Sequence, residues 1–508
     1  MDFFIKKGTI VKTLFWSITA SITGYIINLF VTPYITNEMG MEAYGYVSLT
    51  KTLVDYGSLI TTALNSYAVR YIGVEYHNNN FKKANEYYNS VLFADIFLAI
   101  FILLFAVGFS FTIQATLKVP DTLLADVRKL FILCFLNFAL NTVMTVFSSA
   151  AYLKNKLDLN YFFRTIGYSA EVITLILLFS TCNTKLFYIG VSYVIDSIII
   201  LCSRIWMTNK LTPELKINYT SCRFTAIKEL FLNGIWNSIN SLGNILNTGL
   251  DTLVTNLMLS SIDLGIIGVV KTFPNMFVLL YQLIAQVFQP SMLKSYSIGD
   301  KDKLKRSLQI AMKCSGLVTI VIYVEFVSIG KQFYELWLPG QNAELLYILT
   351  LLALFPNAIE GLIYPCYYVY TLCVKNKIPC LITIVGGILN VLGMIFLINH
   401  TNLGLYAVLI TTVVVMGIIT LITNPLYLSM CLKVDKSFFY GTILKYIFVG
   451  GLICVVMKML SNFLFIKGWV SLIIACSIIA ILSAIIYFIF MFDNTERDCV
   501  LNKIKAKI

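Results

Sequence analysis

Long apolar stretches, separated by short polar loops, make up most of the chain. Fourteen of them are long enough to cross a bilayer as α-helices, since a span needs about 20 mostly apolar residues. They lie at about 13–35, 44–69, 88–112, 129–152, 162–180, 186–203, 229–257, 265–290, 307–329, 345–372, 379–398, 404–429, 441–460 and 469–492. The pattern predicts an all-α integral membrane protein with about 14 transmembrane helices.

The composition supports the same class. Of the 508 residues, 58% are hydrophobic and 13% are charged, whereas soluble domains carry about 25% charged residues. The net charge of +12 comes from Lys and Arg scattered over short loops, so we expect it to reflect membrane topology and not a nucleic-acid partner. The cysteines form no CxxC pair and the two histidines lie in separate loops, so we expect neither a metal site nor a cofactor.

Lysine and arginine concentrate in alternate loops, which predicts an orientation through the positive-inside rule. With the N-terminus inside, the predicted cytoplasmic loops hold most of these residues, and the opposite loops hold few, among them Lys118 and Lys331. An even number of spans returns the chain to the same side. We therefore expect a multi-pass protein with both termini in the cytoplasm.

A weak internal repeat divides the chain. EAYGYVSLTKT (42–52) aligns with IDLGIIGVVKT (262–272) at an offset of 220 residues, which matches Gly45 with Gly265 and Lys51 with Lys271. Each copy holds six predicted spans, and an even number makes the copies parallel repeats about an axis along the membrane normal. We predict four segments: an N-lobe at 1–206, a basic cytoplasmic linker at 207–228, a C-lobe at 229–430, and two further helices with a basic tail at 431–508.

A row of polar residues follows the predicted seventh helix. It consists of Asn233, Asn237, Asn240, Asn244, Asn247 and Asp251, at intervals of three and four. In an α-helix this spacing puts all of them within an arc of about 80°. Amides and a carboxylate are costly in hydrocarbon, so this face must meet protein or water. The length of the row favours the lining of an aqueous substrate cavity, while hydrogen bonds that join helices remain the alternative.

Four cations in or beside the predicted spans are candidates for binding a charged headgroup: Lys51, Lys271, Arg70 and Arg164. Lys271 is the repeat counterpart of Lys51. Arg70 and Arg164 lie near the predicted cytoplasmic boundary, where each could instead extend its charge to the interface as an anchor.

Carboxylates inside the predicted spans are candidates for ion coupling, because a charge in the membrane is costly unless it has a function or a partner. Asp55 shares a helix face with Lys51, and Glu171 shares one with Arg164 and could tether it. The candidates are Asp55, Glu171 and Asp196, with Glu325 and Glu360 as further mid-span carboxylates.

Three stretches resemble the polysaccharide exporters, or O-antigen (Wzx-type) flippases, of the multidrug/oligosaccharidyl-lipid/polysaccharide (MOP) exporter superfamily. The first is PYITNEMGMEAYGYVSLTKTLVDYGSLITTALNSYAVRYI (33–72), in which Pro33-Tyr34, Gly40, Tyr44-Gly45 and Arg70 carry the similarity. The others are LDTLVTNLMLSSIDLGIIGVVKT (250–272) and ELWLPGQNAELLYIL (335–349). The resemblance implies a MATE-like fold, in which two six-helix lobes surround a central cavity.

The resemblance also implies a function. A polyprenyl-pyrophosphate-linked oligosaccharide would move from the cytoplasmic to the periplasmic face of the bacterial inner (plasma) membrane by alternating access, in the biosynthesis of lipopolysaccharide O-antigen. A proton or sodium gradient is the candidate energy source. The implied partners are this lipid-linked oligosaccharide, membrane lipids and other glycan assembly proteins. Asn amides suit sugar hydroxyls because they donate and accept, and Arg70 or Arg164 suits a pyrophosphate.

Two other functions remain as alternatives. A MATE-type drug/cation antiporter of the same superfamily would favour deep carboxylates and a more apolar cavity. An integral-membrane polysaccharide polymerase or ligase would need a large periplasmic loop with catalytic charges, whereas the longest loop is the linker of about 25 residues. The chain also has no GxxxxGK[ST] motif for ATP. We therefore expect a transporter and not an enzyme.

Overall fold

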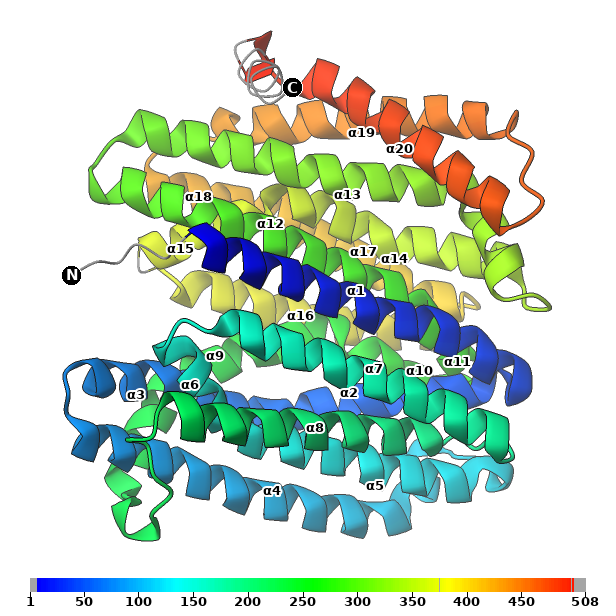
Figure 1. Ribbon diagram of the computed structural model, residues 1–508. Coiled ribbons are helices and arrows are strands. Elements are labelled where there is room, and N and C mark those ends of the chain that lie inside the picture. Colours follow the sequence, from blue (N-terminus) through cyan, green and yellow to red (C-terminus); the bar gives the residue numbers. More distant parts are fainter. Residues whose placement is uncertain (1–6, 374, 495, 498–508) are drawn as a thin grey trace. The chain divides into compact units, whose positions relative to one another are not determined.

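The computed structural model describes residues 7–373, 375–494 and 496–497. In this part of the chain every regular element is helical, which confirms the predicted all-α fold (Figure 1). The basic C-terminal tail with Lys503, Lys505 and Lys507, which we expect in the cytoplasm, lies outside the described residues.

The first half of the chain begins with two helices joined by a tight turn. Gly40 has a φ of +87°, a left-handed conformation that glycine adopts without strain, so α2 starts two residues after α1 ends. The elements are α1 (Lys7–Glu38), α2 (Gly40–Asn65), α3 (Ala68–His77), α4 (Phe81–Leu117), α5 (Asp121–Met144), η1 (Val146–Ser148), α6 (Ser149–Leu153), α7 (Leu157–Thr181), α8 (Tyr188–Leu211) and η2 (Tyr219–Ser221).

The second half contains more interruptions. The sequence predicts one helix over 229–257, but the structure has two, because α9 ends at Thr248 and α10 begins after Gly249, a residue that weakens a helix. The elements are α9 (Phe224–Thr248), α10 (Leu250–Met258), α11 (Ser261–Val270), α12 (Thr272–Ser297), α13 (Lys301–Trp337), α14 (Ala343–Ile363), η3 (Tyr364–Tyr367), α15 (Tyr368–Leu372), α16 (Lys377–His400), α17 (Leu405–Ile418), η4 (Ile419–Thr423), α18 (Asn424–Leu432), α19 (Ser437–Ser461) and α20 (Trp469–Met491).

The number of membrane spans differs from the prediction. Among the described residues, 11 helices are long and apolar enough to cross a membrane, or up to 12 if the bent pair Asp121–Met144 and Val146–Leu153 is one span. The predicted number of 14 is not confirmed. The two predicted spans outside this set, 44–69 and 229–257, form mainly α2, α9 and α10. Their polar residues lower the mean hydropathy, so composition alone does not mark them as spans.

The helices form two compact units. The first runs to Ile245 and adds Thr252–Gly268, and the second consists of Leu246–Asp251 and the chain from Val269 onward. Most of α9 therefore belongs to the first unit, whereas the sequence suggests that the C-lobe starts at 229. The close approach of α9 to α2 explains this, because a Cβ at Gly234 would lie 1.8 Å from the Ala63 carbonyl oxygen. The division into two six-helix lobes remains a prediction.

Each unit is packed around its own helices. In the first, α4, α5 and α8 lie side by side, and α7 contacts α1 and α8 (Figure 1). In the second, α13 contacts α12, α14, α19 and α20. Tyr446 and Tyr487 lie in the core of the second unit, and their hydroxyls donate to the carbonyls of Ala358 and Lys313. Burial of these rings therefore leaves both hydroxyls satisfied.

The linker after α8 is held against the first unit by side chains of α4. Asn85 donates to the Glu214 carbonyl at 2.7 Å and accepts from the Lys216 amide at 2.8 Å. Asn89 makes the same kind of pair with the Lys216 carbonyl and the Asn218 amide. The two side-chain amides thus provide hydrogen-bond partners for backbone groups of a loop that lies outside any helix.

Candidate functional site

The polar row on α9 has an exposed part. Its members are Asn233, Asn237, Asn240 and Asn244. Asn233 donates to the Tyr71 hydroxyl at 2.9 Å, which ties the start of the row to α3. Trp236 and Leu232, on a neighbouring face of α9, are also exposed. The row therefore forms a polar strip beside an apolar one on the same helix.

Contacts with α2 set the rotation of α9. Gly234 packs against the Ala63 carbonyl, and the Ser238 hydroxyl donates to the Leu59 carbonyl at 2.7 Å. Both residues lie on a face of α9 different from that of the exposed amides. The exposed amides are thus left accessible by the packing of α9 within the first unit.

The other end of the row is buried in the second unit. Asn247 is 3% exposed and donates to the Thr383 carbonyl at 2.6 Å. Its own carbonyl accepts from Asn390 at 2.8 Å, and Asn390 also bonds Thr412. At this position the Asn247 amide joins α9 to α16. For Asn247 the structure therefore shows the alternative role, a hydrogen bond between helices.

Asp251 completes the buried end. It is 4% exposed, and its Oδ2 lies 3.4 Å from the Nζ of Lys271. The sequence marks both residues as candidates but does not pair them. Pairing offsets part of the cost of holding each charge away from water.

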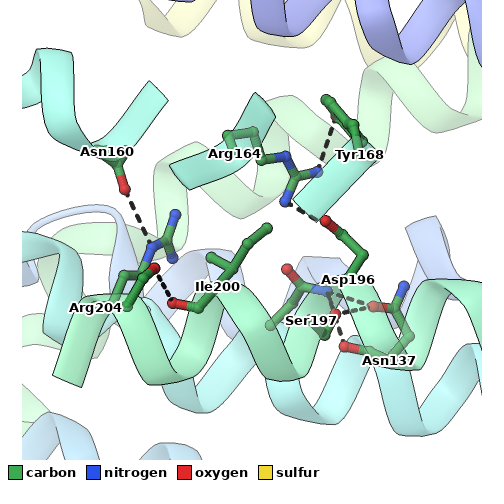
Figure 2. A network of polar contacts seen from close by, with 10 residues as sticks. Asn137, Asn160, Arg164, Tyr168, Asp196, Ser197, Ile200 and Arg204 are labelled. Atoms are coloured by element: carbon green, nitrogen blue, oxygen red, sulfur yellow. Dashed lines mark hydrogen bonds and ion pairs between the residues drawn. The ribbon is translucent and has the colours of Figure 1, made fainter. Parts of the chain in front are cut away.

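In the first unit, α7 and α8 bring Arg164 and Asp196 together (Figure 2). Nη1 of Arg164 lies 3.8 Å from Oδ2 of Asp196, and its Nη2 donates to the Tyr168 hydroxyl at 3.0 Å. Asp196 reaches this position because Gly167 has no side chain: a Cβ there would lie 2.2 Å from Asp196 Oδ1. The Asp196 side chain is 8% exposed and that of Arg164 is 34% exposed, so the carboxylate is buried while the cation is partly accessible.

Further polar side chains of α5, α7 and α8 extend this network (Figure 2). Arg204 donates to Asn160 at 3.3 Å. Ser197 donates to Asn137 and accepts from Asn141 at 3.1 Å. This group was not predicted from the sequence. The signal was present, since Asn137 and Asn141 are two amides four residues apart in the apolar stretch FILCFLNFALNTVM (131–144).

Lys51 lies on α2 near aromatic and amide partners. Its Nζ donates to Asn28 Oδ1 at 3.3 Å and lies 5.2 Å from the ring centroid of Tyr193. Asp55, predicted to share its face, is exposed one turn further along α2. Both of these contacts are to neutral groups, and the carboxylate of Glu171 lies within electrostatic reach of the ammonium.

Glu171 is the second carboxylate of the first unit's network. It is buried on α7 and lies within electrostatic reach of Asp196, Lys51 and Arg164. The sequence suggests that Glu171 tethers Arg164, but the ion pair of Arg164 is with Asp196. The structure thus brings together two of the three carboxylates proposed for ion coupling.

The remaining carboxylates lie elsewhere. Asp95, which the sequence analysis did not select, is fully buried on α4 and accepts from Asn65 at 2.9 Å. In the second unit, Glu360 accepts from the Tyr281 hydroxyl at 3.5 Å, while Glu325 is only partly buried. None of these residues belongs to the Arg164 network shown in Figure 2.

Arg70 lies apart from that network, at the start of α3. It is exposed, and with His77 and Tyr152 it lines an open pocket of about 420 Å³ whose other walls include Val69 and Leu153. A guanidinium beside an apolar wall can meet both a phosphate and the adjoining lipid chain. Arg70 and Arg164, each a predicted candidate for binding the headgroup, therefore belong to separate sites.

Comparison with known proteins gives one family. The family described as "Polysaccharide biosynthesis protein" matches residues 10–295. A curated relative, the uncharacterized membrane protein EpsK of Bacillus subtilis (strain 168), is 27% identical over 489 residues, which cover 96% of this chain and 97% of the relative.

Solved structures share the fold. Lipid II flippase MurJ in an inward closed conformation has a TM-score of 0.69 and 15% identity, with 96% of this chain and 100% of that chain covered. An inward-facing MATE family transporter of the MOP superfamily has a TM-score of 0.67 and 10% identity, with 82% and 96% covered. The predicted MATE-like fold is therefore confirmed.

Proposed function

The chain belongs to the polysaccharide biosynthesis protein family, and on this premise we propose that it is a flippase that carries a lipid-linked oligosaccharide across the membrane. It is a multi-pass membrane transporter and not an enzyme. The observation that carries the proposal is the row of exposed amides on α9, in a helix that also exposes the apolar side chains of Leu232 and Trp236. Exposed amides are costly in lipid, which favours a polar solute or water as their partner.

The amides suit the sugar part of this cargo. An Asn side chain donates and accepts hydrogen bonds, as a sugar hydroxyl does. Asn237, Asn240 and Asn244 repeat the same weak site along one helix face. A cargo that must pass through needs several shallow sites more than one deep site, because it must also leave.

The cations suit the pyrophosphate. Arg164 is partly exposed beside Asp196, and Lys51 has neutral contacts. Arg70 stands in its own open pocket, where an arriving headgroup would meet it before entering the path. We propose that Arg70 receives the headgroup and that Arg164 and Lys51 hold it during passage.

Ion coupling belongs to the same proposal. Asp196 and Glu171 are buried close together, and two carboxylates in a poorly solvated site do not readily both stay ionised. We propose that this pair takes up and releases a proton during the cycle, with sodium as the alternative ion. Asp196→Asn should then make transport independent of an imposed pH gradient. Movement of the glycolipid down its own concentration gradient should continue.

The finer assignments derived from the resemblance also belong here. We propose transport from the cytoplasmic to the periplasmic face of the bacterial inner (plasma) membrane, with both termini in the cytoplasm. We further propose lipopolysaccharide O-antigen as the product and other glycan assembly proteins as partners. These rest on the distribution of Lys and Arg and on the family resemblance.

Reconstitution tests the function. Purified protein is placed in vesicles with a fluorescent polyprenyl-pyrophosphate-linked oligosaccharide, and a membrane-impermeant reductant destroys the label of the outer leaflet. With a flippase, the protected inner label also becomes accessible, whereas vesicles without protein keep it. Efflux of an organic cation from the same vesicles, without movement of the glycolipid, would instead support the MATE-type antiporter.

A further inference from the structure

Asp95 occupies a core position of the first unit. It lies on α4 in line with Tyr88 and Val91 on one side and with Ala99 on the other, and all four side chains are buried. Intervals of seven, four and four residues keep these positions on one face of an α-helix. The exposed fraction of Asp95 is 0%, so its carboxyl group belongs to the interior and not to a surface of the helix.

The polar surroundings of Asp95 consist of one side chain among the described residues. Asn65, the last residue of α2, donates its Nδ2 to Oδ1 of Asp95 at 2.9 Å. No described Lys or Arg lies within electrostatic reach of Asp95, whereas Asp196 and Asp251 each have a cation beside them. Two oxygens of the pair have no hydrogen-bond partner in the described part of the chain, Oδ2 of Asp95 and Oδ1 of Asn65.

An ionised Asp95 does not fit these surroundings. A buried carboxylate is costly unless a cation or several donors compensate its charge, and here a single amide donates to it. A neutral carboxylic acid avoids this cost, and its hydroxyl also supplies a donor. Oδ1 of Asn65 is the acceptor that such a donor needs, because it belongs to the same planar amide whose nitrogen already binds Asp95. One proton therefore satisfies both unpaired oxygens.

We propose that Asp95 is a proton-binding site, occupied in this conformation, and that its neutral acid exchanges two hydrogen bonds with the amide of Asn65. Nδ2 of Asn65 donates to Oδ1 of Asp95, and the Oδ2 hydroxyl donates to Oδ1 of Asn65, so the two planar groups close a ring. The site is separate from Asp196 and Glu171, to which the proposed coupling proton is assigned. It is also independent of the proposed cargo.

The proton on Asp95 also fixes the end of α2. This helix ends at Asn65, and α3 begins at Ala68. Gly234 on α9 packs against residues on both sides of Asn65, since a Cβ there would lie 1.8 Å from the Ala63 carbonyl oxygen and 2.8 Å from Ser66 Oγ. Loss of the proton would leave a buried charge at this junction and weaken the packing of α9 on α2. The neutral pair therefore helps to hold the helix that carries the exposed amides.

Infrared spectroscopy tests the proton directly. The carbonyl stretch of a protonated carboxyl group is separate from the bands of carboxylates and amides, so the spectrum of the parent protein minus that of Asp95→Asn isolates this group. At neutral pH we expect Asp95→Asn to lose one protonated-carboxyl band and Asn65→Leu to shift it, because the hydrogen-bonded partner is gone. Asp435→Asn, at an exposed carboxylate before α19, is the matched control and should leave the band unchanged.

Thermal stability provides a second test. Asp95→Asn replaces the acid by an amide that also donates and accepts, so it should melt no lower than the parent protein at neutral pH. Asn65→Leu should melt a few degrees lower, because it leaves the buried carboxyl group without a partner. Folding of the parent protein takes up a proton at Asp95. Its melting temperature should therefore fall relative to that of Asp95→Asn as the pH rises above about 3.9, where an aspartate in the unfolded chain is ionised.

Sodium distinguishes a proton from a metal cation at the same two oxygens. If they bind sodium, replacing choline chloride by sodium chloride should raise the melting temperature of the parent protein but not that of Asp95→Asn. Such a difference, or a parent spectrum that keeps every protonated-carboxyl band in Asp95→Asn, would overturn the proposal. None of these measurements uses the glycolipid, so a wrong cargo would leave their outcome unchanged.

Discussion

Lys271 and Asp251 form a buried ion pair in the second unit, with 3.4 Å between Nζ and Oδ2. The repeat counterpart of this lysine, Lys51, instead donates to the neutral amide of Asn28 and lies against the Tyr193 ring. The same cation therefore forms a direct ion pair in one copy of the repeat, whereas in the other it contacts neutral groups and has Glu171 only within electrostatic reach. We expect a structural role for Lys271 and a substrate role for Lys51.

The first prediction separates these roles. Asp251→Asn should destabilise the protein by about 3–5 kcal/mol, because it removes the carboxylate that pairs with the largely buried ammonium of Lys271. Adding Lys271→Met should recover most of this loss. Melting temperatures of the purified proteins measure both effects. Lys51→Met is the matched comparison and should reduce glycolipid transport with little change in melting temperature; equal melting temperatures for the single and double variants would contradict the structural role.

The second prediction concerns the exposed amides. Single Asn→Ala changes at Asn240 and Asn244 should be mild, since each removes about 0.5–1.5 kcal/mol of net hydrogen bonding and neighbouring amides remain. The double change to Leu should block transport, because it fills the path with apolar volume, yet leave membrane abundance normal. Trp236→Leu, on the neighbouring exposed face of α9, is the control. Lower abundance with normal transport per molecule would mean that the amides join helices instead.

The third prediction concerns the arginines. Arg164→Lys should lose nearly as much transport as Arg164→Ala, because a lysine cannot contact Tyr168 and Asp196 while offering a planar fork to phosphate. Arg70→Lys should retain more transport than Arg70→Ala, since its open pocket tolerates a point charge. Initial rates of glycolipid transport at several substrate concentrations measure this. Full transport with both arginines replaced by Ala would leave them as interfacial anchors.

The fourth prediction concerns pH and the linker, outside the membrane. The Tyr76 hydroxyl donates to Glu214 at 2.7 Å, and this hydrogen bond lowers the pKa of Glu214 from its ordinary value of 4.5. A carboxyl whose pKa is lowered by folding contributes stability above its unfolded pKa, and the contribution disappears as the pH falls through the folded value.

We therefore expect Tyr76→Phe to lower the melting temperature at neutral pH, and this difference to shrink as the pH falls below 4.5. Melting curves from neutral to acid pH, compared between the variant and the parent protein, measure it. Tyr219→Phe, at an exposed linker tyrosine, is the control and should show no such trend. A difference that stays constant with pH would assign the effect of Tyr76 to packing.

Most helices of this protein can be predicted from local sequence alone. Apolar stretches of spanning length predict most of them, because backbone groups in lipid must be satisfied within the helix. Local pattern also identifies the polar face of α9 and the counterpart segments 42–52 and 262–272. It fails where tertiary packing decides: the helix predicted over 229–257 breaks near Gly249, where the chain passes from one compact unit to the other.

The partners of the charged and polar residues needed the tertiary structure. Periodicity shows that Asn244 and Asn247 share a helix face, but only packing leaves Asn244 exposed and buries Asn247 against α16. Likewise, spacing within α7 suggests Glu171 as the partner of Arg164, whereas Asp196 on α8 forms the ion pair. The physical reason is one of range. Helix periodicity relates residues within a few turns, while contacts between helices depend on how distant segments approach, and single positions such as Gly167 and Gly234 permit that approach.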